Sequence, residues 1–144
     1  MPLRNTVLHI LLADDDAIDR ELFIEGVAKT GVTFTIREAS NGIEVMDMLS
    51  GGNYPHMIFL DLNMPLKDGR ETLKEIKQSS QLRHIPVFIL STSNAIPDVS
   101  LAYSLGANLF IVKPDNFSVL VQLLQTLLGI INKYLFLPVA TGQV

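Results

Sequence analysis

The strongest constraint on the fold is a pattern repeated five times along the chain, in which a short, largely apolar run precedes a segment with helical spacing. Runs that are apolar at nearly every position indicate strands buried on both faces, which are typical of parallel sheets covered by helices. The pattern therefore predicts an α/β domain built from five strand–helix units. The predicted strands are residues 8–13, 33–39, 57–60, 86–90 and 109–112.

Capping and turn residues separate these runs from the predicted helices. Asp16 is placed to cap the helix after the first strand, and Asp68 is placed to cap the helix after the third. Pro97 suits the first turn of the fourth helix, for which Asp98 is expected to act as a cap. The last helix is predicted over residues 117–133.

Length and composition narrow the class of protein. A chain of 144 residues has the length of one domain, which we predict to span residues 1–133, with an apolar tail over residues 134–144. The lack of cysteine excludes a disulfide scaffold, a thiolate metal site and a cysteine nucleophile. The 11 basic and 15 acidic side chains give a formal net charge of −4, which offers no support for nucleic-acid binding.

Two apolar segments raise the question of export or membrane insertion. The run over residues 7–12 ends in three aspartates and is too short for a signal peptide. Residues 116–132 carry no charge, but polar side chains interrupt them, and a membrane span needs about 20 mainly apolar residues. We therefore expect a cytoplasmic protein.

Reactive side chains follow four of the five predicted strands. Asp14 and Asp15 follow the first strand, Asp61 the third, Ser91 the fourth and Lys113 the fifth. An Asp-Asp pair alone is usually a helix cap, but ligands of parallel sheets bind beyond the carboxyl ends of the strands, where all five residues would meet. Because clustered carboxylates repel one another, a divalent cation is expected among them. Oxygen ligands favour a hard cation, and Mg²⁺ is the natural one.

The sequence at these strand ends resembles the receiver domain of the two-component response-regulator family, over roughly residues 7–133. The intervals from Asp61 to Ser91 and from Asp61 to Lys113, which are 30 and 52 residues, match the family pattern. The resemblance implies a flavodoxin-like (βα)5 doubly wound sandwich with a parallel sheet in the order 2-1-3-4-5. The matching segments are Ile-Leu-Leu-Ala-Asp-Asp-Asp at 10–16, Asp-Leu-Asn-Met-Pro with Asp-Gly at 61–69, Ile-Pro-Val-Phe-Ile-Leu-Ser at 85–91 and Val-Lys-Pro at 112–114.

The resemblance also implies that Asp61 is the phosphoacceptor and that a histidine kinase or phosphotransfer protein is the partner. A carboxylate can serve as the nucleophile in phosphoryl transfer. We expect Mg²⁺ to be held by Asp15, Asp61 and the backbone carbonyl of Asn63, with Asp14 reached through a water molecule. Asp19 is interpreted as a helix-face charge, with extension of the acidic pocket as the alternative.

The remaining site residues are expected to bind the phosphoryl group and to respond to it. The Lys113 ammonium would cover one phosphoryl oxygen as a point charge, and the Ser91 hydroxyl would donate to another. A cis peptide bond before Pro114 is expected to aim Lys113 inward. When Ser91 moves toward the phosphoryl group, Phe110 is expected to rotate into the space behind it, although ordinary core packing would also explain an aromatic residue there.

The C-terminal residues bear on output and assembly. Only 11 residues follow Lys133, too few for a DNA-binding module, so we expect the output to be a protein contact. Apolar residues off the buried stripe of the last helix (Val119, Leu123 and Ile130), together with the apolar tail, predict a homodimer through this helix and residues 134–138. The alternative is a tail folded over its own domain. The first helix and the Leu-Pro tail are similar to those of single-domain regulators of the cyanobacterial phytochrome-kinase type.

Two other functions are compatible with an aspartyl nucleophile. Magnesium-dependent phosphohydrolases of the haloacid-dehalogenase type need a second Asp two residues after the nucleophile, where this chain has Asn63. A degenerate receiver that acts as a plain protein-binding module would tolerate losses in the site, and here all five positions are intact. We therefore expect a phosphoacceptor that gains and loses its own phosphoryl group and is not a turnover enzyme.

Overall fold

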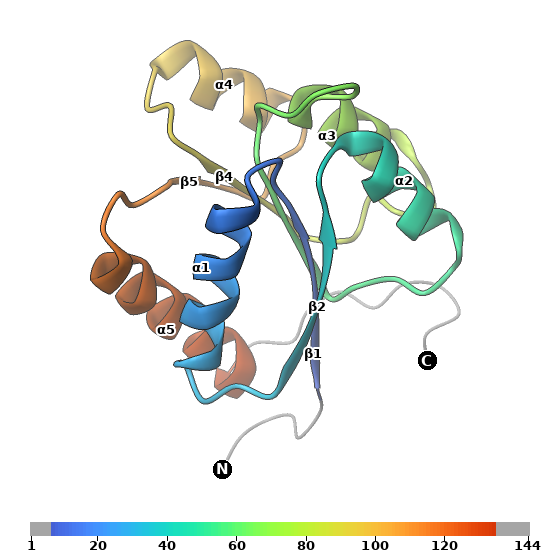
Figure 1. Ribbon diagram of the computed structural model, residues 1–144. Coiled ribbons are helices and arrows are strands. Elements are labelled where there is room, and N and C mark those ends of the chain that lie inside the picture. The colour runs from blue at the N-terminus through green and yellow to red at the C-terminus, as the bar shows by residue number, and fades with distance from the viewer. Residues whose placement is uncertain (1–6, 135–144) are drawn as a thin grey trace.

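A five-stranded parallel sheet flanked by helices forms the computed structural model, which describes residues 7–134 (Figure 1). Strands and helices alternate along the chain, as the sequence predicts. The elements are β1 (Leu8–Ala13), α1 (Ala17–Ala28), β2 (Phe34–Ala39), α2 (Gly42–Ser50), β3 (Met57–Leu60), α3 (Gly69–Gln78), β4 (Val87–Ser91), α4 (Ile96–Ser104), β5 (Leu109–Val112) and α5 (Phe117–Tyr134).

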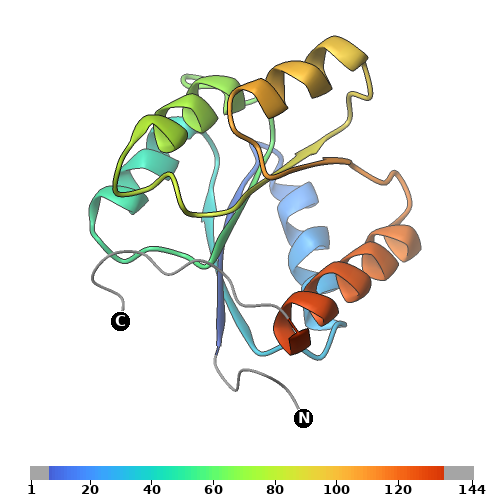
Figure 2. The same ribbon diagram turned by 180° about the vertical axis from the view of Figure 1, so that it is seen from behind.

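The strands lie in the order β2-β1-β3-β4-β5, which confirms the predicted flavodoxin-like topology. Helices α1 and α5 cover one face of the sheet, and α2, α3 and α4 cover the other (Figures 1 and 2). The register pairs Ala13 with Leu60 and Ser91 with Val112, so the carboxyl ends of these strands are level with one another. The chain reverses its winding between β1 and β3, and this switch point opens at the same edge of the sheet.

Alternate residues of each central strand point into two separate apolar layers. On the α1/α5 face, the rings of Phe23, Phe59 and Phe88 pack in succession, with centroid separations of 4.9 and 5.3 Å. On the opposite face, Leu60 and Ile89 pack with Leu73 of α3 and their neighbours. Burying both faces explains why the central strands are apolar at consecutive positions rather than at every second one.

The helix starts follow local capping chemistry, with one correction. The Asp16 carboxylate accepts hydrogen bonds from the backbone N–H groups of Ile18 and Asp19 at the start of α1. Asp68 forms a capping box with Glu71 at the start of α3. The expectation that Asp98 caps α4 is wrong: this helix begins two residues earlier, so Asp98 falls in its first turn and caps nothing.

Helix α5 buries one side and exposes apolar side chains on another. Leu124 and Leu128 are fully buried against the sheet, whereas Val119 and Ile130 are 48% and 49% exposed. Within residues 7–134, no helix combines the length and the apolar character needed to cross a membrane. The predicted tail lies outside the described residues, apart from Tyr134, which ends α5.

Candidate functional site

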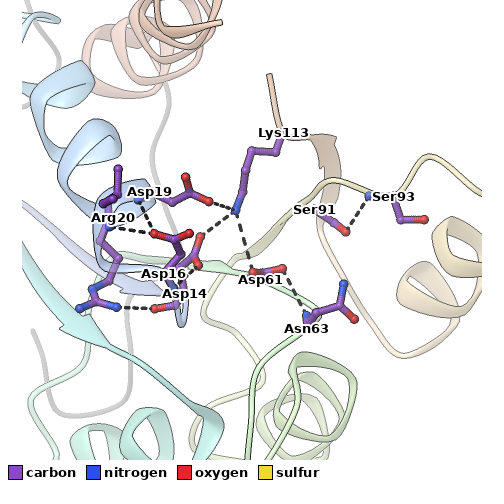
Figure 3. A network of polar contacts seen from close by, with 10 residues as sticks. Asp14, Asp16, Asp19, Arg20, Asp61, Asn63, Ser91, Ser93 and Lys113 are labelled. Atoms are coloured by element: carbon purple, nitrogen blue, oxygen red, sulfur yellow. Dashed lines mark hydrogen bonds and ion pairs between the residues drawn. The ribbon is translucent and has the colours of Figure 1, made fainter. Parts of the chain in front are cut away.

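Backbone hydrogen bonds at the strand ends bring the predicted site residues together. The Asp61 N–H donates to the carbonyl oxygen of Ala13 at 2.9 Å, and the Lys113 N–H donates to that of Ser91 at 2.7 Å. These bonds continue the ladders by one residue past the strands. They hold Asp14, Asp61, Ser91 and Lys113 at one edge of the sheet (Figure 3).

Three carboxylates at this edge could hold a metal ion. Asp14, Asp15 and Asp61 each offer an oxygen, and these oxygens lie within 4.8 Å of one another. Asp14 is 4% exposed and Asp61 is 9% exposed, whereas Asp15 faces solvent. Hard divalent cations such as Mg²⁺, Mn²⁺ and Ca²⁺ bind to sets of oxygen donors of this kind. The donor set therefore fits a divalent cation, as predicted.

The ammonium group of Lys113 faces the acidic cluster. The Lys113 Nζ lies 2.8 Å from Asp14 Oδ2, 3.1 Å from Asp19 Oδ2 and 3.9 Å from Asp61 Oδ2. Burial lowers the pKa of Lys113, but the hydrogen bonds and negative charges of these carboxylates outweigh that effect and raise its pKa overall. Lys113 is therefore a fixed positive charge beside Asp61.

The environment of Asp61 disfavours its charged form. The pKa of this carboxyl group is raised to about 6, mainly by burial and to a smaller extent by the like charges of Asp14 and Asp15. The Asn63 N–H, which donates to Asp61 Oδ1 at 3.2 Å, and the charge of Lys113 oppose the shift in pKa. The metal-free site is thus electrostatically unfavourable at neutral pH, and a bound cation would relieve it.

Ser91 and Phe110 lie where the sequence places them. The Ser91 side chain is fully buried, and its Oγ accepts a hydrogen bond from the Ser93 N–H at 3.2 Å. Phe110 is half-buried against the apolar layer on the α2–α4 face, and its N–H donates to the Tyr103 hydroxyl. The coupled movement of Ser91 and Phe110 stays a prediction.

Gly69 explains how α3 can begin directly beneath the loop that follows Asp61. Its N–H donates to the carbonyl oxygen of Leu62 at 2.9 Å. A Cβ atom at this position would collide with the backbone carbonyl oxygen of Asp61. The Asp-Gly pair of the sequence motif therefore combines a helix cap with a backbone approach that only glycine allows.

Two sequence expectations about this site need correction. The peptide bond before Pro114 is trans, since residues 7–134 contain no cis peptide bond; the trans form is the intrinsically preferred one even before proline. The interpretation of Asp19 as a helix-face charge is incomplete, because its carboxylate pairs with Lys113. The sequence signal was its place in the first turn of the helix that follows Asp14 and Asp15, which indicates closeness to the acidic pocket but not pairing with Lys113.

Comparison with known proteins agrees with this fold. Residues 10–125 match the model of the response regulator receiver domain. The chain is 37% identical to the response regulator Rcp1 of Synechocystis over 122 residues, covering 81% of this chain and 83% of that protein.

Two solved structures are similar over nearly their whole length. The phosphorylated cyanobacterial phytochrome response regulator RcpA superposes with a TM-score of 0.86 at 34% identity, covering 93% of this chain and 100% of that one. The Mn²⁺-bound form of Rcp1 gives a TM-score of 0.83 at 33% identity, covering 92% and 99%. The chain therefore belongs to the family of receiver domains of two-component response regulators.

The raised pKa of Asp61 predicts a pH-dependent stability for the metal-free protein. Between about pH 4 and pH 6 the folded state keeps a proton that the unfolded chain releases, so this group's contribution to the free energy of unfolding falls as pH rises. Asp61→Asn removes the free-energy cost of holding a charged carboxylate at this buried position. In the presence of a chelator, the variant should melt above the wild type at about pH 7.5, and its advantage should shrink at about pH 5. A pH-independent difference in melting temperature would contradict the assignment.

Proposed function

We propose that this receiver domain is a phosphorylation-dependent switch in which Asp61 accepts a phosphoryl group from a histidine kinase or a phosphotransfer protein. The observation that carries the proposal is the placement of Asp61 between a carboxylate cluster that can hold a cation and the ammonium of Lys113. Phosphoryl transfer depends mainly on positioning and on neutralising charge, and this site supplies both. The phosphorylated state of the similar protein RcpA is consistent with the proposal.

In the proposed reaction, one carboxylate oxygen of Asp61 attacks the phosphorus atom of a phosphohistidine. A new O–P bond forms as the P–N bond breaks, and the electron pair of that bond stays with the departing imidazole nitrogen, which takes up a proton. The product is an aspartyl phosphate. Attack by water at phosphorus later breaks the O–P bond, which regenerates Asp61 and releases inorganic phosphate.

We propose Mg²⁺ as the cation, held by Asp15, Asp61 and the backbone carbonyl of Asn63, with Asp14 reached through a water molecule. When bound, it neutralises charge on the reacting phosphoryl group. A divalent cation is consistent with the Mn²⁺-bound form of the similar protein Rcp1. Oxygen donors and retained water suit Mg²⁺.

Lys113 and Ser91 would bind the transferred group. The Lys113 ammonium lies 3.9 Å from Asp61 and needs only a small movement to reach a phosphoryl oxygen. The Ser91 oxygen accepts from the Ser93 N–H, which leaves the hydroxyl hydrogen able to donate to the new dianion. A shift of Ser91 toward the phosphoryl group would open space for Phe110 to rotate, which would reshape the α4–β5–α5 face.

Exposed apolar side chains around the site support docking of a protein phosphodonor. Ile18 at the start of α1, Leu66 in the β3–α3 loop and Ile96 at the start of α4 are 67%, 78% and 74% exposed. Leu66 also has a φ of 68°, a left-handed conformation that non-glycine residues rarely adopt. Such features at the mouth of a site suit contact with a partner.

The output that we propose is a protein contact in the cytoplasm, with no DNA-binding step. The alternative, a phosphohydrolase with multiple turnovers, lacks an acid–base carboxylate at Asn63. The plain binding module remains the other alternative. Gain of a phosphoryl group on Asp61 distinguishes the proposed switch from the plain binding module, and the lack of a carboxylate at position 63 argues against the phosphohydrolase.

The proposed phosphoacceptor can be tested by phosphorylation in vitro. With Mg²⁺ and acetyl phosphate the protein should gain one phosphoryl group, because Asp61 is the ionisable nucleophile beside the cation ligands and Lys113. Intact-mass measurement should show this gain, and the added group should be lost in alkali. Asp61→Asn should show no gain. Equal labelling of the wild type and this variant would rule out the assignment.

The proposed Mg²⁺ site can be tested by thermal unfolding. A cation that binds the folded state stabilises it, by about 2–3 kcal/mol at a hundredfold excess over its dissociation constant. Mg²⁺ should therefore raise the melting temperature of the wild type, and Asp15→Ala should abolish the rise. Asp98→Ala, which removes a carboxylate outside the cluster, should retain it. A full response in Asp15→Ala would place the cation elsewhere.

We also propose that the protein forms a homodimer through α5 and the tail, residues 134–138. An apolar groove of about 530 Å³ runs between β5 and α5, and Val119 and Ile130 are half exposed along it. Strand β5 is the edge of the sheet, and exposed edges favour association. A second copy with the same surface would bury the groove in a twofold arrangement.

Light scattering on the full chain tests this interface. Replacing Val119 and Ile130 together by Gln should shift the dimer toward monomer, because both side chains line the groove. Ile43→Gln, at a similarly exposed apolar residue on α2, should not. Truncation after Lys133 should also weaken the dimer. A dimer unweakened by truncation would remove the tail from the interface, and a wild type that is monomeric at high concentration would refute the homodimer.

A further inference from the structure

The carboxylate of Asp19 lies beside the site without belonging to its cation ligands. It comes from the first turn of α1, and its Oδ2 is 3.1 Å from the Lys113 Nζ (Figure 3). The carboxylates whose oxygens cluster closely enough to hold a metal are those of Asp14, Asp15 and Asp61. We infer that Asp19 is a positioning residue for Lys113, which keeps the ammonium beside Asp61 when a divalent cation occupies the cluster. This inference rests on the proposed phosphoacceptor function.

The geometry gives Lys113 two kinds of partner. Its ammonium has three N–H donors, and it hydrogen-bonds to Asp14 at 2.8 Å and to Asp19 at 3.1 Å. A cation bound at the cluster would be attracted to Asp14 and would weaken the attraction between Asp14 and Lys113. The same cation would repel the ammonium of Lys113. Asp19 is the partner whose charge stays with Lys113, so it offsets that repulsion.

An alternative position for Lys113 exists next to the site. A cavity of about 240 Å³ between α1 and the β5–α5 loop is lined by Asp14, Asp19, Lys113 and Asp115, among others. A Lys113 side chain released from its partners could move into this space and away from Asp61. The bond to Asp19 limits that movement. Asp19 lies on the solvent side of the ammonium, since its side chain is 39% exposed and that of Lys113 is only 14% exposed.

The position of Asp19 is itself well defined by α1. Its N–H donates to the Asp16 carboxylate that caps the helix, at 3.2 Å. Helix α1 is packed through Phe23 and Val27 into the same apolar layer as α5. Asp19 therefore presents its charge from a rigid helical turn rather than from a loop, which suits a positioning role.

The test compares Asp19→Asn with Asp115→Asn. Both substitutions remove one negative charge from the wall of the same cavity. Of these two residues, only Asp19 forms an ion pair with Lys113. At saturating Mg²⁺ and acetyl phosphate, Asp19→Asn should lower the maximal phosphorylation rate about fivefold, the size expected for a half-exposed charged hydrogen bond. Asp115→Asn should stay within about twofold. Asp19→Glu, which keeps the carboxylate, should recover part of the loss.

A second readout does not depend on phosphorylation. Calorimetric titration should show that Mg²⁺ binds more weakly to Asp19→Asn than to Asp115→Asn, because an uncompensated Lys113 repels the cation more strongly. In a Lys113→Met background the difference between the two variants should vanish, since Asp19 acts through Lys113. A difference that persists in this background would show that Asp19 affects the cation without Lys113, through its own charge or through the fold, and would overturn the inference.

The outcomes separate the inference from the proposed function. If the wild type gains no phosphoryl group, the proposed function fails, and the Mg²⁺ titrations still decide whether Asp19 acts through Lys113. If the wild type is phosphorylated and Asp19→Asn behaves like Asp115→Asn in both measurements, the positioning role is wrong. Faster phosphorylation of Asp19→Asn would also overturn it, because Asp19 would then restrain Lys113 instead of supporting it.

Discussion

Repulsion among carboxylates packed at one edge of the sheet is the physical constraint that the rest of this structure has to accommodate. Asp14 and Asp61 are largely buried and Asp15 is next to them, so their charges are poorly screened by water. Burial is the largest cause of the raised pKa of Asp61, and the negative charges of Asp14 and Asp15 add to it. A site with uncompensated carboxylates favours binding of a cation. Its electrostatic energy also changes strongly when the charge on Asp61 changes. The same unfavourable electrostatics thus support cation binding and switching.

The fold tolerates this repulsion because the site is held by backbone rather than by side-chain attraction. Ladder hydrogen bonds fix the residues that follow β1, β3 and β5, and Ser91 at the end of β4 accepts one of these bonds. Two apolar layers hold the strands in place. Gly69 brings the start of α3 against the carbonyl group of Asp61. Since these contacts do not involve the charged atoms, the carboxylates stay close together whether or not their charges are compensated.

Lys113 links the acidic cluster to the helical layer. It bridges Asp14 on the sheet edge and Asp19 on α1, and α1 packs with α5 on one face. On the other side of Asp61, the buried Ser91 contacts the β4–α4 loop through Ser93, whose hydroxyl donates to Asp98. Changes in charge at Asp61 are therefore adjacent to contacts with both α1 and the loop before α4.

The sequence by itself determined the α/β class, the five strand–helix units and the set of strand-end residues, because buried strands and helix caps leave local patterns. The close approach of Gly69 to the backbone of Asp61 became visible only in the structure. Tertiary structure alone decided that Asp19 pairs with Lys113, since 94 residues separate them and no local pattern reports such a contact. The trans bond before Pro114 and the place of Asp98 within α4 were likewise decided by the packed structure. Peptide isomers and helix starts differ by small local free energies, so a sequence pattern alone leaves them open.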